Sequence, residues 1–173
     1  AERLFIVDPI DGTRSYLAGL ADWSIVAAVV ERRRPVEAGV YVPVDDALYL
    51  AAAGSGATRN GEKITASAGE ALAQARVAGP KKFLERLSTI DPGTIHEPKI
   101  HSLALRMTRV AEGCIDAAFA SIHAYDWDLA AADLLVHEAG GVMTNLAGEL
   151  LVYNLHDPVH GAVLAAGSAR HAA

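Results

Sequence analysis

The sequence predicts an α+β fold, with a largely antiparallel sheet in its first half and alternating strands and helices in its second half. Three strand-like runs, residues 23–31, 36–42 and 47–53, are separated by short turn-rich segments, which is typical of an antiparallel meander. From Leu72 onward, short apolar runs alternate with segments of helical periodicity. We therefore expect a sheet-rich lobe over residues 1–70 and an α/β lobe over residues 71–173, without a long linker.

The first apolar run, residues 4–7, is expected to form a buried strand that stops at Asp8-Pro9. Proline has no amide hydrogen and restricts the residue before it, so we expect the chain to turn there and to bring Asp8 and Asp11 together. A short helical pattern follows over residues 13–17, and Gly19 is placed to end it.

The remaining elements follow in order. Asn60-Gly61 suits the positive φ angles of a type I′ turn, which predicts a hairpin over residues 57–64. Residues 24–30 are apolar on both strand faces, so both sides of this sheet should be covered, although the sequence offers few helices for that. In the second half we expect strands at 75–78, 94–96, 114–120, 142–144 and 162–166, and helices at 81–87, 102–112 and 126–139.

Composition excludes several classes of protein. The chain has 173 residues, 51% of them hydrophobic, and a formal net charge of −6, which disfavours a general nucleic-acid binder. We expect Arg32, Arg33 and Arg34 to form a solvated hairpin turn, and the single cysteine, Cys114, to be a buried structural thiol. With no membrane-length apolar run and no signal-peptide pattern, the sequence predicts a cytoplasmic protein without a membrane partner.

The candidate chemistry begins at Asp8-Pro9-Ile10-Asp11-Gly12-Thr13. Two carboxylates held close together repel each other unless a proton or a cation lies between them, and Mg²⁺ prefers oxygen ligands. Gly12 allows a close approach of the backbone, and the start of a helix offers amides to an anion. The alternative is an ordinary surface turn, since turns use Asp, Pro and Gly anyway.

A second acidic pair, Asp126 and Asp128, brackets Trp127 at the start of an apolar helix. Either carboxylate could cap the helix, or one of them could complete a metal site; Asp126 suits the cap as well as Asp128 suits the metal. We expect Trp127 to be a packing residue and Glu138 to pack at the helix end. The seven histidines show no zinc-like spacing, and His156 with His160 is expected to be a loop.

Asp8-Pro9-Ile10-Asp11-Gly12-Thr13, Trp127-Asp128 with Ala130-Ala131, and Glu138-Ala139-Gly140-Gly141 together resemble the two signatures of the inositol monophosphatase family. The likeness runs in order along nearly the whole chain. It implies a layered α/β/α/β/α sandwich and a Mg²⁺-dependent, Li⁺-sensitive phosphomonoesterase acting on a small molecule such as inositol monophosphate. Homodimers are common in that family.

Residue by residue, the resemblance implies two or three Mg²⁺ ions. Asp8 would bridge two of them, the Ile10 carbonyl would bind the first, and Asp11 with Asp128 would hold the second. Gly12 and Thr13 would present amides to the phosphate, the Thr13 hydroxyl would orient the attacking water, and Asp128 would also line the substrate site. Water is then the nucleophile, without a covalent intermediate.

One departure from the family pattern suggests a different substrate. Arg14-Ser15 stands where the inositol enzymes typically have Thr-Asn, and a basic residue at that position resembles the 3′(2′),5′-bisphosphate nucleotidases. Arg14 would then favour a substrate such as adenosine 3′,5′-bisphosphate. A non-catalytic metal-binding or phosphate-binding module is the third hypothesis.

A second departure concerns the N-terminus. The family normally begins with two helices and an acidic segment that binds the first metal, whereas only Ala1-Glu2-Arg3 precedes the first strand, and Glu2 is misplaced for that role. We expect the chain to be a fragment. Its first metal site would keep only Asp8 and the Ile10 carbonyl, turnover would be slow, and the exposed sheet would promote self-association.

Overall fold

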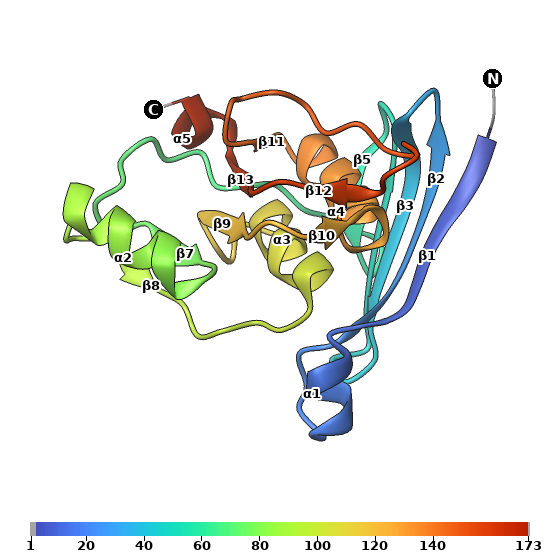
Figure 1. Cartoon of the computed structure of the whole chain (residues 1–173), viewed down its shortest axis with the longest axis horizontal. Coiled ribbons are helices and arrows are strands. Elements are labelled where there is room, and N and C mark those ends of the chain that lie inside the picture. The colour runs from blue at the N-terminus through green and yellow to red at the C-terminus, as the bar shows by residue number, and fades with distance from the viewer. Residues whose placement is uncertain (1–2, 173) are drawn as a thin grey trace.

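The computed structural model describes residues 3–172 and arranges them as two sheets with helices between them (Figure 1). The first sheet is an antiparallel meander in which each strand pairs with the next along the chain. Its strands are β1 (Arg3–Asp11), β2 (Ser24–Glu31), β3 (Arg34–Val42), β4 (Ala47–Ala52), β5 (Gly56–Arg59) and β6 (Glu62–Lys63). Helix α1 (Thr13–Leu17) lies between β1 and β2.

The second sheet has the order β11-β13-β9-β7-β8 and mixes parallel with antiparallel pairs. Its strands are β7 (Arg76–Ala78), β8 (Ile95–His96), β9 (Ala117–Ala120), β11 (Gly141–Asn145) and β13 (Val163–Gly167). A two-stranded ribbon joins β10 (Ala124–Tyr125) to β12 (Val159–His160). The helices of this half are α2 (Lys81–Ile90), α3 (Leu103–Ala111), α4 (Asp126–Glu138) and α5 (Ser168–Ala172).

Helix α4 lies at the centre of the molecule (Figure 1). It packs against β2 and β3 of the first sheet, against β11 of the second, and against α3. Every residue from Leu129 to Val136 is buried, as expected of a helix that is apolar all round. On the opposite face of the second sheet, Leu84 of α2 packs with Val77 and Ala117. The predicted α+β layered class is confirmed, and in residues 3–172 the layers run sheet, helices, sheet, helix.

Strand β1 does not stop at Pro9, so the predicted turn at that residue is wrong. The strand continues to Asp11, and its pairing changes from Asp8 opposite Val26 to Asp11 opposite Ser24. This shift is a bulge in an edge strand, one of the few places where a sheet accepts a proline. The chain turns instead at Gly12, whose φ is +83°.

Two further predictions concern single turns of the chain. Asn60 and Gly61 both have positive φ, as a type I′ turn requires, and the hairpin is confirmed. Cys114 is exposed, which contradicts the predicted buried thiol. The reason is that β9 begins only at Ala117, so Cys114 lies in the turn after α3 and not in a strand.

The arginine run divides at the start of β3. Arg32 and Arg33 form the predicted hairpin turn, with φ angles of 49° and 66°. Arg34 instead turns inward and lies 3.1 Å from the buried carboxylate of Asp133 on α4. This ion pair joins the first sheet to the central helix.

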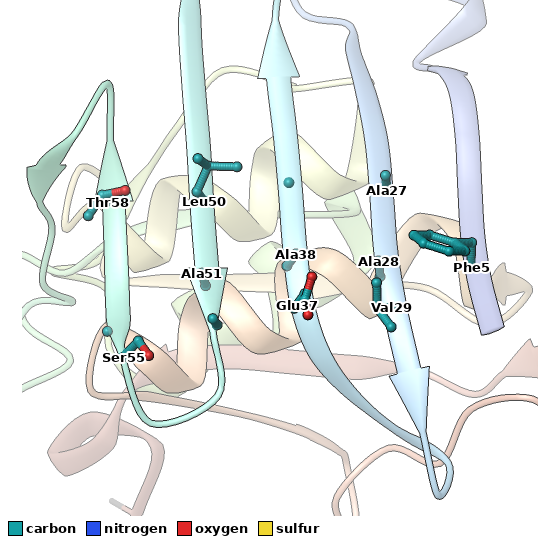
Figure 2. Close-up of a pocket in the computed structure, with 13 residues that line it drawn as sticks. Phe5, Ala27, Ala28, Val29, Glu37, Ala38, Leu50, Ala51, Ser55 and Thr58 are labelled. Carbon is teal, nitrogen blue, oxygen red and sulfur yellow. The ribbon is translucent and has the colours of Figure 1, made fainter. Parts of the chain in front are cut away.

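The outer face of the first sheet is open in the part of the chain that the structure describes. Val7, Ala27, Gly39, Leu50 and Thr58 form one cross-strand row on this face. Phe5 is 74% exposed and Leu50 is 47% exposed. Figure 2 shows the residues that line a shallow hollow of about 520 Å³ across strands β1 to β5. The sequence predicted that both faces of this sheet are covered, but within residues 3–172 only the inner face is.

Glu2, which the sequence places badly for a metal ligand, lies outside the residues that the structure describes. Among residues 3–172, none of the helices combines the length and the apolar character that crossing a bilayer would need.

Candidate metal centre

Three carboxylates from distant parts of the sequence meet where β1 ends and α4 begins. One oxygen from each of Asp8, Asp11 and Asp128 lies within 4.8 Å of the other two. We call these three residues the acidic cluster. The bulge in β1 and the N-terminus of α4 position them, because a bulge redirects the side chains of its strand.

Asp11 is the buried member of the acidic cluster, with 6% of its surface exposed. Its Oδ2 accepts hydrogen bonds from the Ser102 hydroxyl and the Ala104 amide, each at 2.7 Å. Both donors belong to the first turn of α3, where free amides favour a negative charge. Asp11 therefore joins the end of β1 to the start of α3.

Two serines behind Asp11 form a supporting network. Ser102 caps α3 by accepting a bond from the Leu105 amide. Because the Ser102 proton goes to Asp11, the buried Ser24 must be the donor in the 2.9 Å contact between the two hydroxyls. Ser102 was expected to start a helix, but nothing in the sequence indicates its contacts with Asp11 and Ser24. A serine before an apolar helix signals a cap and nothing more.

Asp8 and Ile10 form a compact turn beside the bulge. The Asp8 Oδ1 accepts a bond from the Ile10 amide at 2.9 Å. The Ile10 carbonyl accepts a bond from the Thr13 hydroxyl, also at 2.9 Å. Three of the predicted site residues are therefore tied together by local hydrogen bonds.

Asp126 and Asp128 have different surroundings, and the suggestion that Asp126 caps α4 is wrong. The Asp128 Oδ2 accepts from the Tyr125 amide at 2.7 Å and so caps the helix itself. Asp126 instead accepts from the Asn154 amide and lies 2.7 Å from His160. Asp126 thus connects α4 to the segment around β12, and His160 belongs to a strand where a loop was predicted.

Gly12 occupies a position where no other residue fits without adjustment. Its φ is +83°, which favours glycine. A Cβ at position 12 would lie 3.0 Å from both the Asp22 carbonyl oxygen and the Ser102 amide nitrogen. The glycine therefore permits the close approach between the β1 turn and the start of α3.

Electrostatics favour a cation in the acidic cluster. Burial raises the pKa of Asp128 to about 6; the bond from the Tyr125 amide opposes this rise, and repulsion from Asp11 and Asp8 adds to it. Burial likewise raises the pKa of Asp11, against the bonds from Ser102 and Ala104. Ionising Asp11 and Asp128 together therefore costs free energy, and a nearby cation would lower that cost.

The donor set fits a hard divalent ion. In Asp8 and Asp128 one oxygen accepts a backbone amide, and the other has no hydrogen-bond donor among residues 3–172. Asp11 accepts its hydrogen bonds from the Ser102 hydroxyl and the Ala104 amide through the same oxygen, Oδ2. Each carboxylate is thus oriented through one oxygen while the other can face a metal, and hard divalent cations such as Mg²⁺ take oxygen ligands of this kind.

Arg14 and Trp127 are the remaining residues near the cluster whose roles were predicted. Arg14 is exposed and lines a hollow of about 330 Å³ together with Gly12, Thr13, Lys99 and His101. Trp127 stacks on Tyr125 with ring centroids 4.5 Å apart and stays 38% exposed. It is therefore less enclosed than the predicted packing role implies.

Comparisons with known proteins agree with these motifs. The sequence profile described as "Inositol monophosphatase family" matches residues 1–173. A fructose-1,6-bisphosphatase/inositol-1-monophosphatase of Thermotoga maritima is 34% identical over 154 residues, which cover 86% of this chain and 59% of that protein. The Nus factor SuhB of Escherichia coli is 31% identical over 83% of this chain and 57% of its own length.

Solved structures give the same fold. A Thermotoga maritima IMPase matches with a TM-score of 0.86 at 30% identity, covering 99% of this chain and 66% of that one. An extragenic suppressor protein suhB from Bartonella henselae matches with a TM-score of 0.85 at 28% identity, over 97% of this chain and 68% of that one. The chain thus spans about three fifths of the length of the curated relatives.

Proposed function

The chain belongs to the inositol monophosphatase family, and on that premise we propose that it hydrolyses a small phosphate monoester with the help of Mg²⁺. The observation that carries the proposal is the acidic cluster, in which Asp8, Asp11 and Asp128 lie within 4.8 Å of one another. No covalent nucleophile is needed for this reaction, because water can attack the phosphorus.

The metal-binding part of the proposal assigns a role to four residues. Asp8 and the Ile10 carbonyl would hold the first ion, and Asp8, Asp11 and Asp128 would hold the second. When bound, Mg²⁺ supplies Lewis-acid activation of water and stabilises the charge on the leaving oxygen. The hydrogen bonds from Ser102 and Ala104 to Asp11 orient that carboxylate and favour its ionised form against the effect of burial.

The remaining site residues handle the phosphate and the water. Gly12 and Thr13 present their amides to the phosphate. The Thr13 hydroxyl donates its proton to the Ile10 carbonyl, so its lone pairs face outward as acceptors for the attacking water. Asp128 also lines the hollow next to the cluster that contains His101 and Arg106, which supports a role for it in substrate binding.

Phosphate release from inositol 1-phosphate with increasing Mg²⁺ tests the proposal. We expect turnover that requires Mg²⁺, is inhibited by Li⁺, and is lost in Asp128→Asn, a variant that keeps a cap acceptor at the same place. Circular dichroism of the variant checks that it is folded. Turnover that is unaffected by removal of Mg²⁺ or of the Asp128 charge would overturn the assignment.

A second candidate substrate is the 3′-phosphate of an adenosine bisphosphate, which Arg14 favours. Its side chain lines the same hollow as Gly12 and Thr13. Parallel assays with inositol 1-phosphate and adenosine 3′,5′-bisphosphate separate the two substrates, and Arg14→Thr should lower the preference for the bisphosphate. Release from neither ester, in a protein that still binds Mg²⁺, would indicate the non-catalytic module. The homodimer and the cytoplasmic location stay predictions.

A further inference from the structure

A buried carboxylate ties the start of α4, which carries Asp128, to a distant segment of the chain. Asp126 is the first residue of the helix, and 7% of its side chain is exposed. Its Oδ1 lies 2.7 Å from the His160 Nε2, and its Oδ2 accepts the Asn154 amide at 2.8 Å. An ionised carboxylate only accepts hydrogen bonds, so the His160 Nε2 carries a proton. Both oxygens of Asp126 therefore connect α4 to residues 154–160.

His160 is itself held in place from two sides. It pairs with Ala124 in the ribbon of β10 and β12, next to the start of α4 (Figure 1), and its carbonyl accepts the His123 amide at 3.1 Å. The ring of the buried Tyr153 lies 5.2 Å from the imidazole, measured between centroids. Only 10% of the His160 side chain is exposed. An imidazole enclosed in this way has little room to turn, so its bond to Asp126 keeps one direction.

The bond from His160 to Asp126 bears on Asp128 because the two aspartates share the first turn of α4. The Asp126 amide donates to the Pro158 carbonyl at 3.0 Å, and the Tyr125 amide donates to the Asp128 Oδ2 at 2.7 Å. The first amides of a helix have no partner within the helix, so its start is held by contacts from outside. The contacts of Asp126 therefore help to decide where Asp128 lies relative to the rest of the acidic cluster.

We infer that His160 is a positioning residue for Asp128: by holding Asp126, it fixes the start of α4 and with it the place of Asp128 in the acidic cluster. The inference rests on the proposed Mg²⁺ site and adds to it a residue from outside the cluster. Loss of a group that orients a metal ligand through hydrogen bonds typically weakens metal binding by about 10- to 100-fold. We therefore expect His160 to affect Mg²⁺ affinity beyond its effect on stability.

Removing the imidazole tests the inference. His160→Ala should weaken Mg²⁺ binding, measured by calorimetry, about tenfold. His160→Gln, which offers an amide donor, should recover most of the affinity. Hydrogen exchange at the Tyr125 amide should speed up in His160→Ala, since that amide is bonded to the Asp128 carboxylate. This second readout needs neither metal nor substrate. A Mg²⁺ affinity that is unchanged in His160→Ala would overturn the positioning role.

Tyr153→Phe is the matched control. The Tyr153 hydroxyl donates to the buried Asp133 Oδ2 at 2.9 Å, so the same segment holds the same helix at a second point, more than one turn beyond Asp128. Phenylalanine keeps the ring that packs on His160. The variant should lower the melting temperature, keep Mg²⁺ affinity within about twofold of the parent, and leave exchange at the Tyr125 amide unchanged. Equal losses of Mg²⁺ affinity in Tyr153→Phe and His160→Ala would attribute the effect to general loosening of α4 and overturn the inference.

A double-mutant cycle tests whether His160 acts through Asp126. Asp126→Ala should weaken Mg²⁺ binding at least as much as His160→Ala, because it also frees the Asn154 amide. Adding His160→Ala to Asp126→Ala should then have little further effect. A full additional loss in the double variant would contradict the route through Asp126. Thermal melting shows whether Asp126→Ala folds, and if it does not, His160→Ala with its Tyr153→Phe control still decides.

Failure of the phosphatase function would leave this test intact. If the parent chain binds Mg²⁺ but hydrolyses no ester, the Mg²⁺ affinities of the variants decide the positioning role. If it binds no Mg²⁺, the metal site fails and exchange at the Tyr125 amide decides. Faster exchange in His160→Ala with parent-like exchange in Tyr153→Phe supports the positioning role. Parent-like exchange in His160→Ala, or equally faster exchange in both variants, overturns it.

Discussion

Asp128 both caps a helix and belongs to the acidic cluster. Its Oδ2 accepts a hydrogen bond from the Tyr125 amide at the start of α4, and one of its oxygens lies within 4.8 Å of oxygens of Asp8 and Asp11. An alanine at this position would therefore remove a helix cap, worth about 1 kcal/mol, together with a proposed metal ligand. Asparagine separates the two effects because it keeps an acceptor oxygen and removes the charge.

We predict that Asp128→Asn stabilises the metal-free protein at pH 8 by about 1 to 3 kcal/mol. The pKa of Asp128 in the folded protein, about 6, is above the ordinary value of an aspartate. The folded protein therefore loses stability as Asp128 ionises, progressively as the pH rises from about 4 through 6. The advantage of the variant should vanish near pH 4. Urea unfolding at both pH values measures it, and added Mg²⁺ should reverse the order at pH 8.

Gly12 gives the second residue-scale prediction. Gly12→Ala should lower the free energy of unfolding by about 1 to 3 kcal/mol and weaken Mg²⁺ binding, because its Cβ would press on Asp22 and Ser102 beside the cluster. Gly19→Ala is the matched control: its φ is also positive, at +67°, but a Cβ there meets nothing within 4 Å. Equal losses in the two variants, with Mg²⁺ binding intact, would show that only backbone strain matters.

At the scale of elements, Glu138 at the end of α4 holds the turn between β4 and β5. Its two carboxylate oxygens accept the amides of Gly54 and Gly56, at 2.8 and 2.7 Å. Together with the Arg34–Asp133 ion pair, this contact fixes α4 against the first sheet. The position of Asp128 at the other end of the same helix depends on that docking.

Glu138→Gln should therefore destabilise the fold by about 1 to 2 kcal/mol, since one of the two amides loses its acceptor and the other keeps only an uncharged one. Hydrogen exchange at Gly54 and Gly56 should speed up, and Mg²⁺ affinity should fall only slightly. Glu62→Gln, at an exposed position in β6, serves as the control. Unchanged exchange at the two glycines would contradict the role assigned to Glu138.

Elements governed by local chemistry were predictable from the sequence, and contacts between distant elements were not. Asn60-Gly61 specifies a turn, and the apolar residues of α4 specify a helix, through local sequence alone. The bulge at Pro9 depends on pairing with β2, and the bond from Ser102 to Asp11 joins residues 91 positions apart. Asp8 and Asp11 were expected to lie together from their own spacing, and the family resemblance added Asp128 to them. The roles of Asp126 and Glu138 depend on partners that no local pattern identifies.

At the scale of the whole molecule, the first sheet has one face packed on α4 and one face open. The open face carries Phe5 and Leu50 beside the shallow hollow (Figure 2). Val7 lies in the same cross-strand row as Leu50. Contiguous apolar patches of this kind are uncommon on monomers and mark sites of association. A flat sheet face offers such a surface to a second copy of the chain.

We therefore predict that residues 1–173 alone self-associate in a concentration-dependent manner through this face. Sedimentation velocity should show association that becomes weaker when the salt concentration is lowered. The oligomers should dissociate in the double variant Phe5→Lys with Leu50→Lys, because contact would bury two lysines. Leu17→Lys is the control: Leu17 is 78% exposed but lies on α1, away from the open face. A parent chain that stays monomeric at high concentration, or a double variant that associates as strongly as the parent, would contradict the prediction. Because the altered residues lie outside the acidic cluster, the double variant should bind Mg²⁺ as the parent does, which separates association from metal binding.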